Sequence, residues 1–305
     1  MAIKRDLTPA EEKALIEREL GRRQFIKPVK YWLDTGSKPL NAVLGSPDYG
    51  LAYGKMIEIF GPNSHGKTML SLLIAGLAQR QGATVAWVDF EQCLDQAWVE
   101  AQGVDYSKLH IFTMELQEFK GEKEPRLETA QEVLERVETW MKNRFNRDSE
   151  GRLLVVVDSL AAMEVEEEAA AGLTNQNMRT NMSLPSFLSK FSKRWMGRAA
   201  VYNAMIIMIN QIRTSPKAYG NPEYAPGGNA KNHAFSVRAT VRRVKGGRIM
   251  QGPIIVGLRG VIKNIKNKTG GGSLEGAEVG FETRFGKKKW RFPSASAVRK
   301  ESSEE

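Results

Sequence analysis

The feature that most constrains this chain is the stretch over residues 56–82. An apolar run at residues 56–60 is typical of a buried strand, and an apolar-periodic helix is predicted from Met69. Between them lies GPNSHGKT, a match to G-x-x-x-x-G-K-[ST] in the strand–loop–helix context that this pattern requires. The chain is therefore predicted to fold around a sheet in which one strand ends in a phosphate-binding loop.

The residue types of this loop explain its chemistry. Glycines let the backbone turn tightly and point its N–H groups at phosphates, and the helix N-terminus adds partial positive charge. Lys67 can reach the β- and γ-phosphates, and the Thr68 hydroxyl can ligate magnesium. The whole loop is predicted to bind nucleotide: Gly61, Pro62, Asn63, Ser64, His65, Gly66, Lys67 and Thr68.

Length and composition narrow the class of protein. The 305 residues can hold one large α/β core, or one core with small appendages. No apolar run approaches the ~18 residues of a membrane span. The N-terminal residues lack an apolar signal core, which predicts a cytoplasmic location without a membrane partner. The lone cysteine, Cys93, cannot form an internal disulfide and agrees with a reducing compartment.

The net charge of +10 is unevenly distributed. Residues 242–300 carry fifteen Lys or Arg against three Glu, a local balance of +12, so the remainder is about −2. This asymmetry favours a polyanion as the partner of the C-terminal part, and a solvated basic face is the alternative.

Further strands are predicted at residues 84–89, 109–113, 153–158 and 204–210. Asp158 ends the continuous run LLVVVD, the profile of a strand buried on both faces, and is predicted to help hold magnesium. Helices are predicted around 95–102, 127–145 and 184–197, whereas residues 164–181 are predicted as a partly disordered loop. Residues 212–230 are rich in Gly, Pro and Asn and carry cations and aromatics suited to a single nucleic-acid strand.

The two ends of the chain differ from its centre. Thr8, Pro9 and Glu11 open an N-terminal helix, and residues 1–33 are assigned as a helix and connector that act in oligomerisation. The residues themselves leave open whether this helix packs on its own core or on a neighbour. Residues 34–293 form the core, in which runs at 234–244, 253–266 and 277–285 are predicted antiparallel strands. Residues 294–305 are predicted to be a disordered tail.

Taken together, these motifs resemble bacterial and phage RecA-type homologous recombinases over residues 35–285. The resemblance implies an α/β P-loop NTPase core with a mainly parallel central sheet, extended by antiparallel C-terminal strands. VDFEQCLD is similar to the segment that carries the family's catalytic glutamate, which falls on Glu91 and would polarise the attacking water. The same segment assigns an adenine contact to Asp95 and adenine stacking to Trp98, where the family often has Tyr. VVVDSLAAM matches the Walker B strand and assigns that acid to Asp158.

The resemblance also assigns residues to DNA. NQIR at residues 210–213 is similar to the family's hinge between nucleotide and DNA, in which Gln211 senses the γ-phosphate. Arg213, one of the cations of the loop that follows, is a candidate DNA contact. PGGNA matches the end of the second DNA-binding loop and assigns contacts to Gly227, Gly228 and Asn229. The first DNA-binding loop maps loosely onto residues 166–182 and assigns Arg179.

The sequence KNK places Lys266 and Lys268 where the family has two lysines that reach the neighbouring subunit's ATP. Cations supplied in trans stabilise charge on a transferring phosphoryl group, so the resemblance implies a helical filament with ATP at the subunit interface. Two departures weaken the match: Asn232 and His233 replace a cation and an apolar interface residue. Little chain follows Phe285, which makes the chain look like a phage-encoded or minimal recombinase without the larger bacterial C-terminal domain.

The implied function is a DNA-dependent ATPase that uses ATP and Mg²⁺ to form a filament on single-stranded DNA. It would pair that strand with homologous duplex DNA in recombination and in repair of DNA damage. Two alternatives stay open: another RecA-fold motor, such as a ring helicase or a circadian-clock-type ATPase, and a non-catalytic mediator that coats single strands. A closed hexamer would favour the motor, and absence of hydrolysis would favour the mediator.

Overall fold

The computed structural model describes residues 8, 11, 29–118, 125–165, 178–214, 223–224, 232–269, 274–285 and 290–304, but not the side chains of 178–183, 213–214, 223–224 and 301–304. The chain forms two compact units, Met1–Lys30 and Tyr31–Glu305. In the first unit, the Glu11 carboxylate accepts a hydrogen bond from the Thr8 N–H at 2.9 Å, and the Glu11 N–H donates to the Thr8 hydroxyl at 3.3 Å. This reciprocal pair is the capping box expected at the start of the predicted N-terminal helix.

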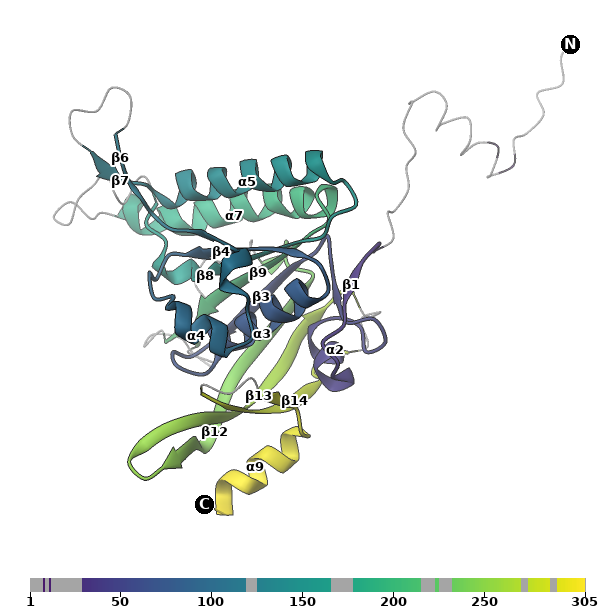
Figure 1. The fold of residues 1–305 in the computed structure, drawn as a ribbon, viewed down its shortest axis with the longest axis vertical. Helices are drawn as coiled ribbons and strands as arrows, with labels where there is room; N and C mark the ends of the chain where they lie inside the picture. The colour runs from purple at the N-terminus through teal and green to yellow at the C-terminus, as the bar shows by residue number, and fades with distance from the viewer. Residues whose placement is uncertain are drawn as a thin grey trace, which may run out of the picture. The chain divides into compact units, whose positions relative to one another are not determined.

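The second unit is built on a nine-stranded sheet with the order β15-β14-β13-β12-β3-β9-β8-β4-β5 (Figure 1). Neighbours from β12 to β5 pair in parallel, and β12 to β15 pair antiparallel. The strands are β3 Met56–Gly61, β4 Thr84–Asp89, β5 Leu109–Phe112, β8 Leu153–Asp158, β9 Ala204–Gln211, β12 Val237–Gln251, β13 Ile254–Asn267, β14 Glu278–Arg284 and β15 Trp290–Arg291. The predicted fold class is therefore confirmed.

Helices cover both faces of the parallel strands (Figure 1). On one face pack α3 Lys67–Arg80 and α4 Gln96–Ala101, and on the other α5 Ala130–Arg147 and α7 Met178–Val201. Helix α2 Lys38–Leu44 packs on β12, β13 and β14. Strand β8 shows why its sequence is apolar throughout: Leu154 and Val156 enter the first core, and Val155 and Val157 enter the second. A strand buried on both faces cannot alternate apolar with polar residues.

Short elements join this framework. They are β1 Trp32–Leu33 paired with β2 Leu51–Ala52, β6 Leu116–Gln117 paired with β7 Arg126–Leu127, β10 Arg213–Thr214 paired with β11 Glu223–Tyr224, and the 3-10 turns Tyr106–Lys108 and Leu160–Ala162. Because β1 pairs inside the second unit, that unit begins at Tyr31 rather than at residue 34.

Helix α5 begins at Ala130, not at residue 127 as the sequence predicted. Glu132 closes a capping box with Thr129 and also receives a two-pronged ion pair from Arg126, with both N–O distances 2.9 Å. These contacts hold the preceding residues extended, so Leu127 lies in β7. Helix α7 starts at Met178, inside the stretch predicted as loop.

The C-terminal part differs from prediction in two places. Strand β12 continues through Gly246 and Gly247, where a break was predicted, because a β-bulge absorbs these residues. The predicted disordered tail is wrong for residues 295–304, which form helix α9 Ala295–Glu304. Val298 of α9 is buried against β14, where Gly280 leaves room that a side chain would fill, and Arg299 pairs with Glu278 at 2.7 Å.

The fold brings the carboxyl ends of β3, β4, β8 and β9 to one edge of the sheet. In open α/β sheets this edge is where ligands bind. Over the described part of the chain, no helix is both long and apolar enough to cross a membrane.

Candidate functional site

The phosphate loop joins β3 to α3 at that edge. Gly61 must lack a side chain because a Cβ there would overlap the Val241 carbonyl of β12. Gly66 has φ +94°, a conformation that favours glycine, and leads directly into Lys67, the first residue of α3. The tight turn therefore places the N-terminal N–H groups of α3 beside the loop, the arrangement that binds anions.

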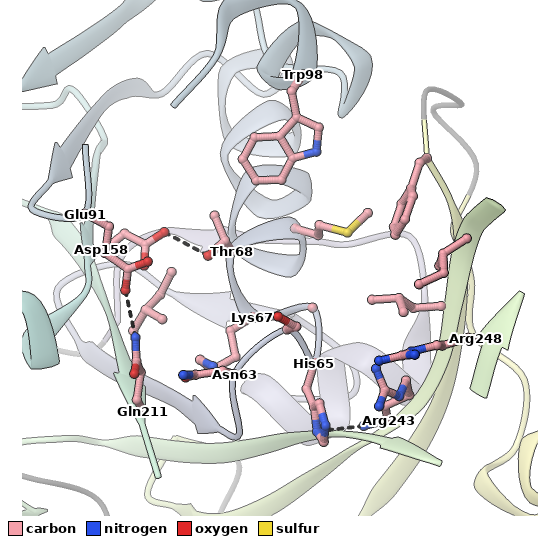
Figure 2. Close-up of a pocket in the computed structure, with 17 residues that line it drawn as sticks. Asn63, His65, Lys67, Thr68, Glu91, Trp98, Asp158, Gln211, Arg243 and Arg248 are labelled. Carbon is pink, nitrogen blue, oxygen red and sulfur yellow. Dashed lines mark hydrogen bonds between the residues drawn. The ribbon is translucent and has the colours of Figure 1, made fainter. Parts of the chain in front are cut away.

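A cavity of about 620 Å³ opens above the loop (Figure 2). This volume lies within the range of about 300–1,000 Å³ that ligand pockets occupy. Its lining includes Asn63, Ser64, His65, Gly66, Lys67 and Thr68 of the loop, Glu91, Trp98, Asp158 and Gln211, and also Met69, Ile209, Arg243, Arg248, Ile255, Leu258 and Phe285. Residues predicted from four separate motifs thus meet in one cavity.

The acidic side of the cavity fits a magnesium ion. The Thr68 hydroxyl donates to Asp158 Oδ2 at 2.9 Å, so two oxygen ligands lie side by side. Burial, with added repulsion from Glu91 and Asp89, raises the pKa of Asp158 to about 7, against the Thr68 hydrogen bond and Lys67. Among described residues no group of three or more His, Cys, Asp or Glu could hold a metal alone. The Thr68 hydroxyl and the Asp158 carboxylate suit Mg²⁺, which takes one or two protein oxygens together with phosphates and waters.

The loop lysine is buried, with 7% of its surface exposed. Its Nζ donates to the Pro62 carbonyl at 2.8 Å. Burial lowers the pKa of Lys67, whereas Asp158 and Glu91 act to raise it. A phosphate chain in the cavity would supply the anionic partner that this ammonium group needs, so the site fits a nucleoside triphosphate.

Glu91 and Gln211 lie in contact, as Figure 2 shows. Gln211 Nε2 donates to Glu91 Oε1 at 2.9 Å, and the Ser159 hydroxyl donates to the same oxygen at 2.5 Å. The carboxylate is thus oriented by residues at the ends of β8 and β9 while it stays exposed toward the cavity. An oriented, accessible carboxylate is what activation of a water molecule requires.

The two residues predicted for the base play different parts. Trp98 lines the cavity. Asp95 caps helix α4 and accepts a hydrogen bond from the Trp98 N–H at 2.9 Å. This cap orients the helix that carries the indole, and Asp95 is not among the described lining residues of the cavity.

The two lysines of KNK lie away from this cavity. In the sheet register, Lys266 of β13 lies opposite Arg238 of β12, and Arg238 lies opposite Glu58 of β3. The Lys266 Nζ donates to the Asn232 carbonyl at 2.6 Å. Neither Lys266 nor Lys268 is among the cavity's described lining residues, and both were predicted to act on a neighbour's nucleotide.

The residues predicted to contact DNA lie at the ends of described segments or outside them. Arg179 belongs to α7 and Arg213 to β10, but their side chains are outside the described part of the chain. Gly227, Gly228 and Asn229 lie wholly outside the described residues.

Sequence reasoning missed one wall of the cavity. Arg243, Arg248, Ile255 and Leu258 come from the β12–β13 pair, and Phe285 follows β14. Arg243 lies in the run at residues 234–244 that was predicted as a strand, but no motif pointed to the others. Apolar residues on such a wall suit a flat base or a ribose.

His65 connects the loop to this wall. Its Nδ1 accepts a hydrogen bond from the backbone N–H of Arg243 at 3.2 Å. Burial, followed by repulsion from Arg243, Lys67 and Arg242, lowers the pKa of His65 to about 4. The imidazole is therefore neutral at neutral pH and serves as an acceptor.

A buried network extends the site below the loop. Glu58 is fully buried and contacts Arg238 at 2.6 Å and the Asn210 amide at 3.0 Å. The Asn210 side-chain oxygen accepts the Gln211 N–H at 2.9 Å. One carboxylate thus joins β3, β9 and β12 next to the residue that holds Glu91.

Comparison with known proteins agrees with the motifs. The family model described as the RecA N-terminal domain matches residues 13–282. The chain is 32% identical over 238 residues to Protein RecA of Acholeplasma laidlawii strain PG-8A, which covers 77% of this chain and 64% of that protein. It is 33% identical over 264 residues to Protein RecA of Colwellia psychrerythraea strain 34H, covering 84% and 68% respectively. The match to the A. laidlawii protein thus spans less than two thirds of that protein's length.

Proposed function

The chain belongs to the RecA family, and on this premise we propose that it is a DNA-dependent ATPase and recombinase. It binds single-stranded DNA as a helical filament and pairs it with homologous duplex DNA, in recombination and repair in the cytoplasm. The observation that carries the proposal is the hydrogen bond from Gln211 to Glu91. It joins the candidate catalytic carboxylate to the residue that begins the candidate DNA-binding segment.

ATP is held by the loop N–H groups and by Lys67, whose ammonium group faces the phosphate chain. Thr68 and Asp158 would hold Mg²⁺, which neutralises charge on the phosphates. Glu91 accepts a hydrogen bond from the attacking water and orients it toward the γ-phosphate. Trp98 stacks on the adenine, and Asp95 maintains the helix from which Trp98 projects.

Gln211 couples this chemistry to DNA. When a γ-phosphate is present, the Gln211 amide exchanges its bond to Glu91 for one to the phosphate and so releases the carboxylate for water. The same movement orders residues 212–230 on a DNA strand, with Arg213, Gly227, Gly228 and Asn229 at the backbone. Arg179 contributes from the start of α7. Hydrolysis reverses these steps and releases the strand.

The catalytic site is completed by a second copy of the chain. Lys266 and Lys268 of that neighbour reach the phosphate chain and stabilise the charge that develops during transfer. The N-terminal unit, Met1–Lys30, acts as the oligomerisation element of the core. A head-to-tail contact of this kind does not close on itself and produces a filament.

The decisive experiment combines an ATPase assay, with and without single-stranded DNA, with negative-stain electron microscopy. We expect hydrolysis to increase on DNA and helical filaments to form with ATP. Closed rings with translocation activity would replace the proposal by a ring helicase. DNA binding without hydrolysis would replace it by a strand-coating mediator.

A further inference from the structure

The wall that the sequence motifs did not predict is formed by the distal part of the β12–β13 pair. We call residues 243–258 the arm. Where the arm begins, the pairing shifts from Arg243↔Gly260 to Arg248↔Leu258, so four β12 residues oppose Arg259 alone. The partners Gly260 and Leu258 are two positions apart, and residues two apart on a strand point to the same face. The bulge therefore places Arg243 and Arg248 on one face of the pair.

That face is turned toward the phosphate loop. A Cβ built on Gly66 would lie 3.9 Å from the Leu258 side chain. The backbone N–H of Arg243 donates a hydrogen bond to His65 Nδ1 of the loop at 3.2 Å. Both arginines line the cavity, and Figure 2 shows them across it from Glu91, Asp158 and Gln211. The arm is thus in contact with the loop within a single subunit.

The negative charge in and around the cavity would be balanced by these two arginines. Lys67 is the lysine of the loop itself, and it already faces Asp158 and Glu91. A triphosphate adds further negative charge to this side. Guanidinium groups bind phosphate oxygens through two parallel N–H bonds and lose less hydration than an ammonium group does. Arg248 is also exposed, so its guanidinium group is accessible to a phosphate.

We propose that Arg243 and Arg248 bind the phosphate chain of the nucleotide held by their own subunit, and that the arm is a cis nucleotide-binding element. The inference rests on the nucleotide site of the proposed function but requires neither DNA nor a neighbouring subunit. Each cavity then receives cations from both ends of a β12–β13 pair: arginines from its own subunit and, in a filament, lysines from the next.

The test measures binding of a fluorescent ATP analogue to the full chain, with magnesium and without DNA. Arg248→Ala should weaken binding about tenfold or more, the effect of losing a charge-assisted hydrogen bond. Arg248→Lys should recover only part of the affinity because it keeps the charge and loses the paired N–H geometry. Lys245→Ala is the matched control, since Lys245 lies in the same bulge but outside the described cavity lining, and it should stay within about twofold of the parent chain.

Competition with ATP, ADP, AMP and adenosine identifies the contact. The proposal requires the Arg248→Ala loss to shrink along this series and to vanish for adenosine. An equal loss for adenosine, or no loss for ATP, would overturn it. Failure of the proposed function is separate: hydrolysis that ignores DNA would sink the recombinase, whereas the Arg248 effect on ATP binding would stand.

Discussion

The two ends of the β12–β13 pair hold cations in contrasting settings. At one end Arg238 is paired with the fully buried Glu58 at 2.6 Å and lies over the Phe60 ring at 4.8 Å. Beside it the Lys266 ammonium group is anchored to a backbone carbonyl. At the other end Arg248 is exposed and is positioned by strand register. The first end is organised by protein partners in advance, whereas the second is organised to receive a ligand.

Lys67→Ala gives the largest expected loss of ATP hydrolysis, against which the variants at both ends of the pair can be compared. Removing the loop ammonium group should lower ATP hydrolysis by about 10³-fold, comparable to loss of one strong electrostatic contact to a transition state. Steady-state phosphate release measures the effect, and circular dichroism of the variant checks the fold. Hydrolysis within tenfold of the parent chain would mean that the cavity is not the catalytic site.

Lys266→Ala tests the lysine end. We expect turnover to fall at least about tenfold, because a cation supplied in trans stabilises transferring charge. Binding of the fluorescent ATP analogue by the isolated subunit should be unchanged. Lys263→Ala is the control, since Lys263 lies on the same strand and forms an ion pair with Glu278 at 3.2 Å. Equal loss in both variants would point to a disturbed strand instead of a missing cation.

Glu58→Gln removes the buried carboxylate that pairs with Arg238. Arg238 then keeps its charge without a counter-ion, and the free energy of unfolding should fall by about 3 kcal/mol. The double variant Glu58→Gln with Arg238→Met removes the stranded charge and should recover most of that loss. Urea unfolding of the three chains gives the comparison. A double variant no more stable than Glu58→Gln would show that the pair itself is not the source of the effect.

His65 gives the smallest effect, at the arm end. The fold lowers its pKa from 6.5 to about 4, so the unfolded chain takes up this proton first as the pH falls. The stability that His65 contributes is complete above pH 6.5 and is lost between pH 6.5 and 4. His65→Asn should flatten the decline in thermal unfolding temperature over that window. Parallel pH profiles for the two chains would contradict this assignment.

Local sequence patterns predicted the strands of the sheet core and the side of the cavity that carries the phosphate loop. Strands such as β4 and β8 are continuous apolar runs, and the loop glycines and Lys67 follow from backbone and phosphate chemistry alone. Features that depend on distant partners were missed. Val298 can anchor α9 only because Gly280 lies opposite, and Arg248 enters the cavity only because a bulge shifts its register. Neither relation is visible in a local window of sequence.

The bulge divides the ribbon into two separate hydrogen-bonded ladders. Seven residue pairs join Val237–Arg243 to β13, and four pairs form the distal ladder, which begins at Arg248↔Leu258 and ends at Gln251↔Ile254. A short ladder at the end of a sheet can open without unfolding the rest. Amide hydrogens of the distal ladder should therefore exchange with solvent much faster than those of the first ladder. If Arg248 binds phosphate, nucleotide will slow that exchange, and the arm will record site occupancy as a change in local protection.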